Sequence, residues 1–242
     1  VAFSLVVVFI LPIITAILIG VSYSFLGTSG TDSAFEVWMQ QNPVEVSILS
    51  DEKTIISPIE SAVSYLITVP LQIWFIFWLL RRRKIDLSKN LGLYHFNRNA
   101  LIYSLVAYLI LYLVLTAYSY AFQISPPEEF IKLMQATPFV LNFLMVVIGA
   151  PIVEELLFRG FLFSQLKTTK LGINGSIILT SLIWTSIHLQ YDLFLLIPIF
   201  LIGLLLGYLM HKYNSLYLVI IVHAVHNLQA TLFIEFFYDY FY

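Results

Sequence analysis

The chain has 242 residues, of which 60% are hydrophobic and only 11% charged, and its mean hydropathy is +0.91. Soluble domains carry about 25% charged residues, so this composition excludes a soluble globular domain and predicts an integral membrane protein. The formal net charge of −2 and the pI of about 6.2 argue against a nucleic-acid partner. There is no cysteine, so the sequence does not indicate a redox compartment.

Apolar runs of about 20 residues, the length that crosses the hydrocarbon of a bilayer, recur along the chain. None shows the alternating pattern of outer-membrane strands. We therefore expect an all-α, polytopic membrane helix bundle with about seven transmembrane helices. The first run lacks a basic n-region and a clear A-x-A-like site, so no cleavable signal is expected there. The predicted spans are residues 2–25, 59–80, 100–122, 137–166, 173–190, 193–211 and 215–236.

The basic residues gather in loops on one side of these spans. A cluster from Arg81 to Arg98 follows the second span, Lys167 and Lys170 follow the fourth, and Lys212 follows the sixth. Most acidic residues fall in the opposite loops. By the positive-inside rule, the N-terminus is predicted to be cytoplasmic and residues 27–58 are predicted to form a long acidic external loop.

The fourth predicted span contains three ionisable residues within six positions, Glu154, Glu155 and Arg159. At a helix centre, Asp, Lys and Arg each cost roughly 2.5–3.5 kcal/mol to insert, so such residues indicate a functional site by default. Glu155 and Arg159 are four positions apart, which predicts a structural ion pair. Glu154 lies about 100° around the helix and has no basic residue at helical spacing, so it is a candidate general base or acid.

Two later spans supply possible partners for Glu154. His188 follows Trp184 by one helical turn, and His223 precedes Asn227 by one turn. A turn that bears His and Asn presents two hydrogen-bond donors to one point, as an oxyanion hole requires. At ~1.5 Å of rise per residue, these side chains overlap in depth with Glu154, so four groups from three helices are expected to meet inside the bilayer.

Two further patterns favour a packing role. His226 lies next to Asn227 but on another face of the helix, so we expect it to be structural. Gly203 and Gly207 form G-x-x-x-G, which is typical of close helix packing. Pro151 removes a backbone donor three residues before Glu154 and is expected to kink the helix there.

Three motifs together resemble those of the CPBP (Abi) family, which contains the type II CAAX prenyl endopeptidases. They are E-E-L-L-F-R-G at 154–160, W-T-S-I-H at 184–188 and H-A-V-H-N at 223–227. The family usually has Phe where Trp184 stands. The resemblance implies an intramembrane endopeptidase of the glutamate type with no metal and no other cofactor. By position, it implies that Glu154 and His188 activate water, that His223 and Asn227 form the oxyanion hole, and that Glu155 and Arg159 support the site.

The resemblance covers residues 137–236, which we expect to be the catalytic core. Residues 1–136 are then N-terminal transmembrane helices with the external loop at 27–58. The implied substrate is a peptide or a membrane protein. The bacterial relatives in the family favour a multi-pass protein of the bacterial cytoplasmic membrane.

Three alternatives stay open at the level of the sequence. Glu with two His is also a zinc ligand set, although the H-E-x-x-H spacing is absent, so a zinc-dependent membrane protease is one alternative. Buried Glu and His equally suit a transporter or proton pathway, but the sequence shows no internal repeat. The third alternative is a non-catalytic membrane scaffold or immunity protein of the same fold.

Overall fold

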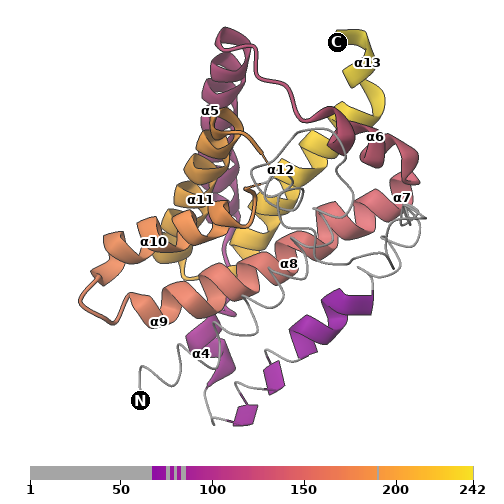
Figure 1. Ribbon diagram of the computed structural model, residues 1–242. Coiled ribbons are helices and arrows are strands. Elements are labelled where there is room, and N and C mark those ends of the chain that lie inside the picture. Colours follow the sequence, from indigo (N-terminus) through magenta and orange to yellow (C-terminus); the bar gives the residue numbers. More distant parts are fainter. Residues whose placement is uncertain (1–66, 75–76, 79–80, 83–85, 190, 242) are drawn as a thin grey trace, which may run out of the picture. The chain divides into compact units, whose positions relative to one another are not determined.

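The computed structural model describes residues 67–74, 77–78, 81–82, 86–189 and 191–241. These residues belong to the second of two units, Pro58–Tyr242. Their regular elements are all helical (Figure 1), as the composition predicted. The predicted span at 2–25 and the predicted acidic loop at 27–58 lie outside the described residues, and the predicted span at 59–80 is described only in part.

Five consecutive segments form one continuous helix, from Phe139 to Leu166. Two of the five, η1 and η2, are π-helical, so the helix is wider there than an α-helix. The elements in chain order are α4 (Leu87–Leu91), α5 (Arg98–Ala121), α6 (Glu128–Ala136), α7 (Phe139–Asn142), η1 (Phe143–Gly149), α8 (Ala150–Glu155), η2 (Leu156–Phe163), α9 (Ser164–Leu166), α10 (Gly172–Ser186), α11 (Leu193–Tyr213), α12 (Leu216–Phe236) and α13 (Tyr238–Phe241).

Four helices in the described part of the chain are long and apolar enough to cross a membrane, so the protein is a multi-pass membrane protein. They are Arg98–Ala121, Phe139–Leu166, Leu193–Tyr213 and Leu216–Phe236. The predicted spans at 100–122, 137–166, 193–211 and 215–236 are confirmed by these helices.

The predicted span at 173–190 is wrong in length. α10 has 15 residues and ends at Ser186, so it is ~22 Å long and His188 lies in the turn that follows. The His188 side chain explains the early end. In a longer helix, the backbone N–H of His188 would bind the Trp184 carbonyl. Here the side-chain Nδ1 of His188 lies 3.0 Å from that carbonyl, and the backbone N–H binds the Thr185 carbonyl instead.

The sequence did not predict α6. This short helix follows Pro127 and carries Glu128 in its first turn, both favourable at a helix start. It buries Ile131 and Met134 against Ile234 of α12. α6 therefore covers the C-terminal end of α12.

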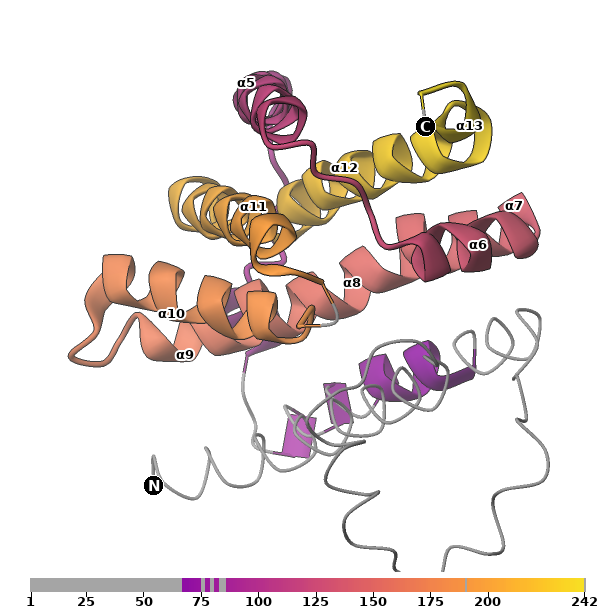
Figure 2. The ribbon, with the colours of Figure 1, turned by 45° about the horizontal axis from the view of Figure 1, so that its top comes forward.

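Two glycines of α11 bring it close to α10. A Cβ atom added at Gly203 would lie 3.1 Å from Ser181 Cβ and 3.1 Å from Trp184 Cε3, and one added at Gly207 would lie 3.0 Å from Ile177 Cγ2. The predicted close packing of the G-x-x-x-G motif is thus confirmed. α10 packs against both η2 and α11 (Figures 1 and 2), which fixes Trp184 between the long helix and α11.

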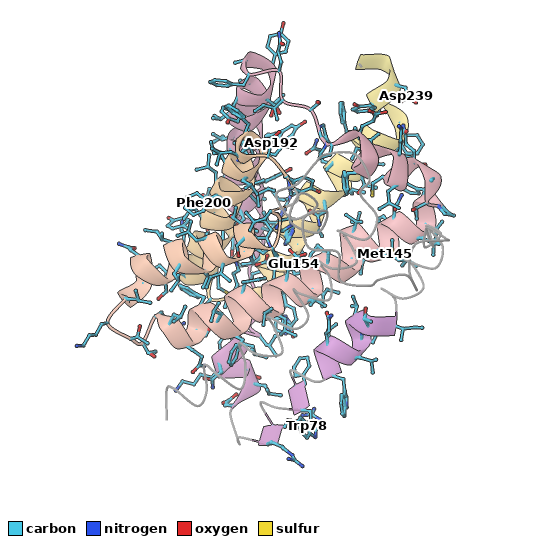
Figure 3. All side chains as sticks on the ribbon, in the orientation of Figure 1. Trp78, Met145, Glu154, Asp192, Phe200 and Asp239 are labelled. Carbon is cyan, nitrogen blue, oxygen red and sulfur yellow. The ribbon has the colours of Figure 1, made fainter. Side chains whose placement is uncertain are left out.

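α12 lies along the N-terminal half of the long helix, on the same side as α10 (Figure 2). It contacts η1 and α8 of the long helix, and it also contacts α5 and α11. Glu154, labelled in Figure 3, lies about midway along the long helix. Side chains from α8, α10 and α12 therefore converge at the level of Glu154.

Candidate active site

Glu155 and Arg159 form the predicted ion pair, and neither side chain is exposed. Arg159 Nη1 donates to Glu155 Oε1 at 2.8 Å, and Nη2 donates to the Gly203 carbonyl at 3.1 Å. The guanidinium also lies over the Trp184 ring, 4.8 Å from its centroid. Arg159 thus joins the long helix to α10 and α11, and Gly203 contributes an acceptor as well as close packing.

His223 binds the same oxygen of Glu155 from α12. Its Nδ1 lies 2.8 Å from Glu155 Oε1, and its Nε2 lies 4.0 Å from Glu154 Oε2. An ionised carboxylate only accepts hydrogen bonds, so Nδ1 carries the hydrogen and donates it. Glu155 therefore fixes the orientation of the imidazole and directs Nε2 toward Glu154.

Glu154 differs from Glu155 in both exposure and partners. Its side chain is 21% exposed, and in the described part of the chain no Lys or Arg forms an ion pair with it. Its Oε2 accepts a hydrogen bond of 2.6 Å from Trp184 Nε1. Glu154 is thus the partly exposed carboxylate and Glu155 the buried one, and the two have different partners, as the helical spacing predicted.

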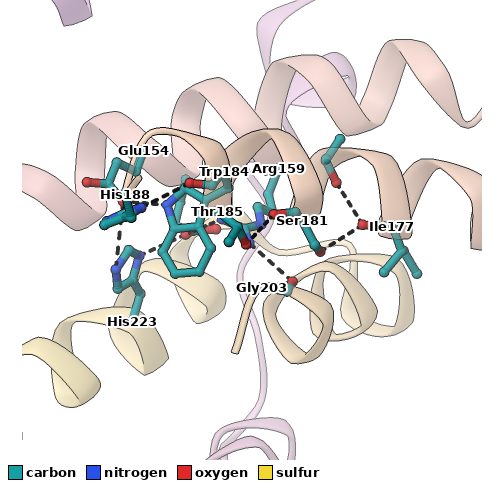
Figure 4. A network of polar contacts seen from close by, with 11 residues as sticks. Glu154, Arg159, Ile177, Ser181, Trp184, Thr185, His188, Gly203 and His223 are labelled. Atoms are coloured by element: carbon teal, nitrogen blue, oxygen red, sulfur yellow. Dashed lines mark hydrogen bonds and ion pairs between the residues drawn. The ribbon is translucent and has the colours of Figure 1, made fainter. Parts of the chain in front are cut away.

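His188 lies on the opposite side of Trp184 from the buried ion pair. Its Nδ1 donates to the Trp184 carbonyl, because a carbonyl accepts only, so in the neutral ring Nε2 keeps a free lone pair. No hydrogen bond joins His188 to Glu154 among the described residues. Trp184 contacts both, and Figure 4 shows the three side chains gathered beside His223.

Asn227 forms a hydrogen bond with a backbone carbonyl of the long helix. Its Nδ2 donates to the Val146 carbonyl at 2.8 Å. In η1 the Ala150 N–H binds the Met145 carbonyl, five residues earlier, and the same pattern would pair Val146 with Pro151, which has no N–H. Asn227 therefore supplies the donor that Pro151 lacks, and the second hydrogen of its amide is left for another acceptor.

His226 faces away from this cluster. Its Nδ1 lies 3.3 Å from the Tyr108 hydroxyl of α5, which also donates to Gln229 at 3.3 Å. The Tyr108 and His226 rings meet edge to face, 5.8 Å apart. The structure thus places His226 in the packing of α5 against α12, the kind of role that its position on the helix predicted.

A metal site would need several ligands in one place. In the part of the chain that the structure describes, no three His, Cys, Asp or Glu side chains come together as a metal ion requires. Glu154 and His223 are the pair that could share such an ion, and a third ligand is not within reach of both.

The comparison with known proteins agrees with this geometry. Residues 136–229 match the family model of the Rce1-like type II CAAX prenyl endopeptidases. These residues form an Rce1-like domain. No curated protein and no solved structure matches the chain.

The Rce1-like domain contains all six predicted site residues, and its family is one of CAAX-type intramembrane endopeptidases. The chain therefore contains a domain of this type of membrane-embedded endopeptidase, as its resemblance to the CPBP (Abi) family predicted. The buried Glu155–His223 contact and the adjacent Glu154 fit the catalytic motifs of the family.

Trp184 contributes more to the Rce1-like domain than the sequence indicated. The sequence predicted only that its ring packs beside His188, which the structure shows with centroids 5.3 Å apart. The indole N–H also binds Glu154, and a Phe, usual in the family, has no such donor. The structure buries Trp184, at 3% exposed, and a buried indole N–H normally finds an acceptor.

We expect Trp184→Phe to slow turnover roughly 10- to 100-fold with little change in thermal stability. Phe keeps a six-membered aromatic ring but has no N–H, so it loses a hydrogen bond to a carboxylate, and such bonds contribute about 1.5–3 kcal/mol. The measurement is single-turnover cleavage with a parallel thermal unfolding curve. Trp74→Phe is the matched control, because Trp74 is 62% exposed and should show no change. Normal turnover in Trp184→Phe would show that the indole N–H is dispensable.

Proposed function

We propose that the Rce1-like domain is a glutamate-type, metal-independent endopeptidase that hydrolyses peptide bonds within or near the membrane. One observation carries the proposal. The partly exposed Glu154 carboxylate lies 4.0 Å from Nε2 of His223, whose other nitrogen is held by the buried Glu155. At this separation, one water molecule can lie within hydrogen-bond reach of both Glu154 Oε2 and His223 Nε2.

Glu154 acts as the general base in this proposal. Its carboxylate takes one proton from water while the water oxygen bonds to the carbonyl carbon of the scissile peptide, and the carbonyl oxygen becomes an oxyanion. When the tetrahedral intermediate collapses, the C–N bond breaks and the leaving nitrogen takes a proton from the Glu154 carboxyl group. The neutral Nε2 of His188 is the second acceptor that helps to orient and deprotonate the water.

His223 and Asn227 stabilise the oxyanion. His223 Nδ1 already donates to Glu155, so Nε2 can donate only when the ring carries a second hydrogen. The Glu155 carboxylate, 2.8 Å from Nδ1, holds the ring in place, as carboxylates paired with catalytic histidines do. Asn227 offers the amide hydrogen that does not bind Val146, and the Val146 bond holds the amide in place.

We propose seven transmembrane helices with a cytoplasmic N-terminus for the whole chain, in a bacterial cytoplasmic membrane. The charges at the ends of the described helices support this orientation. Lys167 follows α9 and Lys212 lies in the last turn of α11, whereas Asp192 caps the start of α11. The proposed division stays at 1–136 for the N-terminal helices and 137–236 for the catalytic core.

The proposed substrate is a peptide or a membrane protein. Comparative membrane proteomics of cells with the wild-type enzyme and cells with Glu154→Gln tests both activity and substrate. Precursors should accumulate in the Glu154→Gln cells, and their cleaved products should appear only with the wild type. Identical proteomes under conditions in which both proteins are expressed would favour the non-catalytic scaffold or immunity protein.

Activity is expected to survive metal chelation. Glu154 and His188 supply the proposed proton transfers, and His223 and Asn227 stabilise the oxyanion, so EDTA or phenanthroline should leave single-turnover cleavage within about twofold of the untreated enzyme. Metal analysis of the purified protein is the parallel measurement. Loss of cleavage on chelation, with recovery on adding zinc, would favour the zinc-dependent protease.

Asn227→Ala and His223→Ala should each lower turnover roughly 100- to 1000-fold, because removing one oxyanion donor costs about 2.7–4 kcal/mol in the transition state. The KM should change much less. The double variant should fall short of the product of the two effects, since both donors act on one oxygen. His226→Ala is the matched control on the same helix and should retain most activity. An inactive His226→Ala beside a nearly normal Asn227→Ala would overturn the oxyanion assignment.

A further inference from the structure

α12 carries a polar side chain at every fourth position. These residues are His223, Asn227, Thr231 and Glu235, and because each lies about 40° around the helix from the one before, they form a ridge that winds slowly around α12. Polar residues within a membrane helix are expensive, so a continuous ridge of them indicates a function. The first two belong to the proposed active site, whereas nothing above gives a role to Thr231 or Glu235.

The oxygens of Thr231 and Glu235 are buried without a protein partner. Thr231 is 1% exposed, and neither its Oγ1 nor Glu235 Oε2 has a hydrogen-bond partner among the described residues. A buried polar atom left unsatisfied costs about 1–3 kcal/mol, and in folded proteins such atoms usually bind ordered water. Each of these two oxygens therefore requires a polar ligand.

Three contacts show what α12 packs against along this ridge. His223 meets Glu155 and Asn227 meets Val146, whereas near the end of α12 the rings of Phe236 and Phe139 lie 5.7 Å apart. Later residues of α12 thus contact earlier residues of the long helix. Thr231 lies between Asn227 and Phe236 in α12, so we place it opposite the part of the long helix between Phe139 and Val146.

The polar residue in that stretch is Asn142, which is 1% exposed. Its amide donates to the carbonyls of Met134 and Thr137 at 2.7 and 3.2 Å, at the end of α6. The seam between α12 and the α7–η1 segment therefore holds buried polar groups on both helices, beside the apolar cluster of Ile131, Met134 and Ile234.

We propose that this seam conducts water from the C-terminal end of α12 to Glu154 and His223. The inference rests on the proposed function, because each hydrolysed peptide bond consumes one water molecule. Successive polar groups of this series are about 6 Å apart along the helix axis, and two water molecules joined by hydrogen bonds of about 2.8 Å bridge that distance. The Thr231 hydroxyl both donates and accepts, and Glu235 accepts at the outer end.

The chain has no cysteine, so single-cysteine variants can be tested without altering other positions. Thr231→Cys should react with a small, positively charged methanethiosulfonate, because the reactive thiolate forms in water and not in an apolar core. Asp239→Cys on the exposed α13 reports which side of the membrane is labelled. Reagent added on that side should modify Thr231→Cys at least tenfold faster than Ile234→Cys.

Ile234 is the matched control because it is equally buried, at 5% exposed, and lies nearer the end of the helix. Equal rates at positions 231 and 234, or modification of Thr231→Cys only from the other side, would overturn the water path. The labelling rate does not depend on catalysis, so an inactive protein that is labelled as expected contradicts the proposed function alone.

Glu235→Cys is the second variant on the same ridge, in case Thr231→Cys does not fold. A group attached to Glu235→Cys should block the seam and lower single-turnover cleavage at least tenfold, whereas the same group on Asp239→Cys should leave cleavage unchanged. Full cleavage by the labelled Glu235→Cys enzyme would also overturn the proposal.

Discussion

Replacing Glu154 with glutamine is expected to abolish cleavage and leave the fold intact. Glutamine has nearly the same shape, and its amide oxygen can still accept the hydrogen bond that Trp184 donates at 2.6 Å. It cannot take a proton from water at neutral pH. General bases contribute about 100- to 10,000-fold to enzymatic rates, so single-turnover cleavage should fall by at least about 100-fold.

Glu128→Gln is the control for this variant. Glu128 lies on α6, where the hydrogen bond from Lys132 lowers its pKa, and its side chain is 75% exposed. Removing that charge should change neither cleavage nor the thermal unfolding temperature. Wild-type turnover in purified, folded Glu154→Gln would end the assignment of Glu154 as the general base.

The sequence predicted the described long helices because their apolar runs are continuous and long enough to span the bilayer. It failed at the end of α10, where the residues after Ser186 are still apolar enough to extend a helix. The helix ends because His188 binds the Trp184 carbonyl with its own side chain, and hydropathy does not encode that contact. α6 was missed because nine residues give too short a pattern to separate a helix from a loop.

For the candidate site, the sequence predicted contacts within one helix better than contacts between helices. The four-residue spacing alone placed Glu155 against Arg159. It could not show that the same Glu155 oxygen also binds His223, because that contact depends on how α12 packs against α8. Pro151 predicted a disturbed helix. The sequence could not show that Asn227 of α12 donates to the Val146 carbonyl, because that contact depends on how the two helices pack.

Glu155→Ala and Arg159→Ala are each expected to lose stability as well as activity. Both side chains are fully buried, so removing one leaves the other as an uncompensated charge, which typically costs about 3–5 kcal/mol. Arg159→Ala also frees the Gly203 carbonyl, and Glu155→Ala removes the group that orients His223. The measurement is the free energy of unfolding in mixed micelles, with single-turnover cleavage on the same samples.

A surface pair with the same spacing is the matched control. Lys132 and Glu128 are also four positions apart and form an ion pair, but their side chains are 71% and 75% exposed. Solvent and salt screen such pairs, so Lys132→Ala should leave stability and cleavage near wild type. A large loss of stability in Lys132→Ala would show that the assay does not separate buried from exposed pairs.

The double variant Glu155→Leu with Arg159→Met separates structure from chemistry. Removing both charges leaves no unpaired ion, so stability should recover toward the wild-type value. Cleavage should stay low because the nitrogen of His223 that faces Glu155 then has no partner, and the ring loses its orientation. Adding His223→Ala to the double variant should therefore lower cleavage little further. A strong additional loss would show that His223 works without Glu155, and it would assign the lost activity to Arg159 itself.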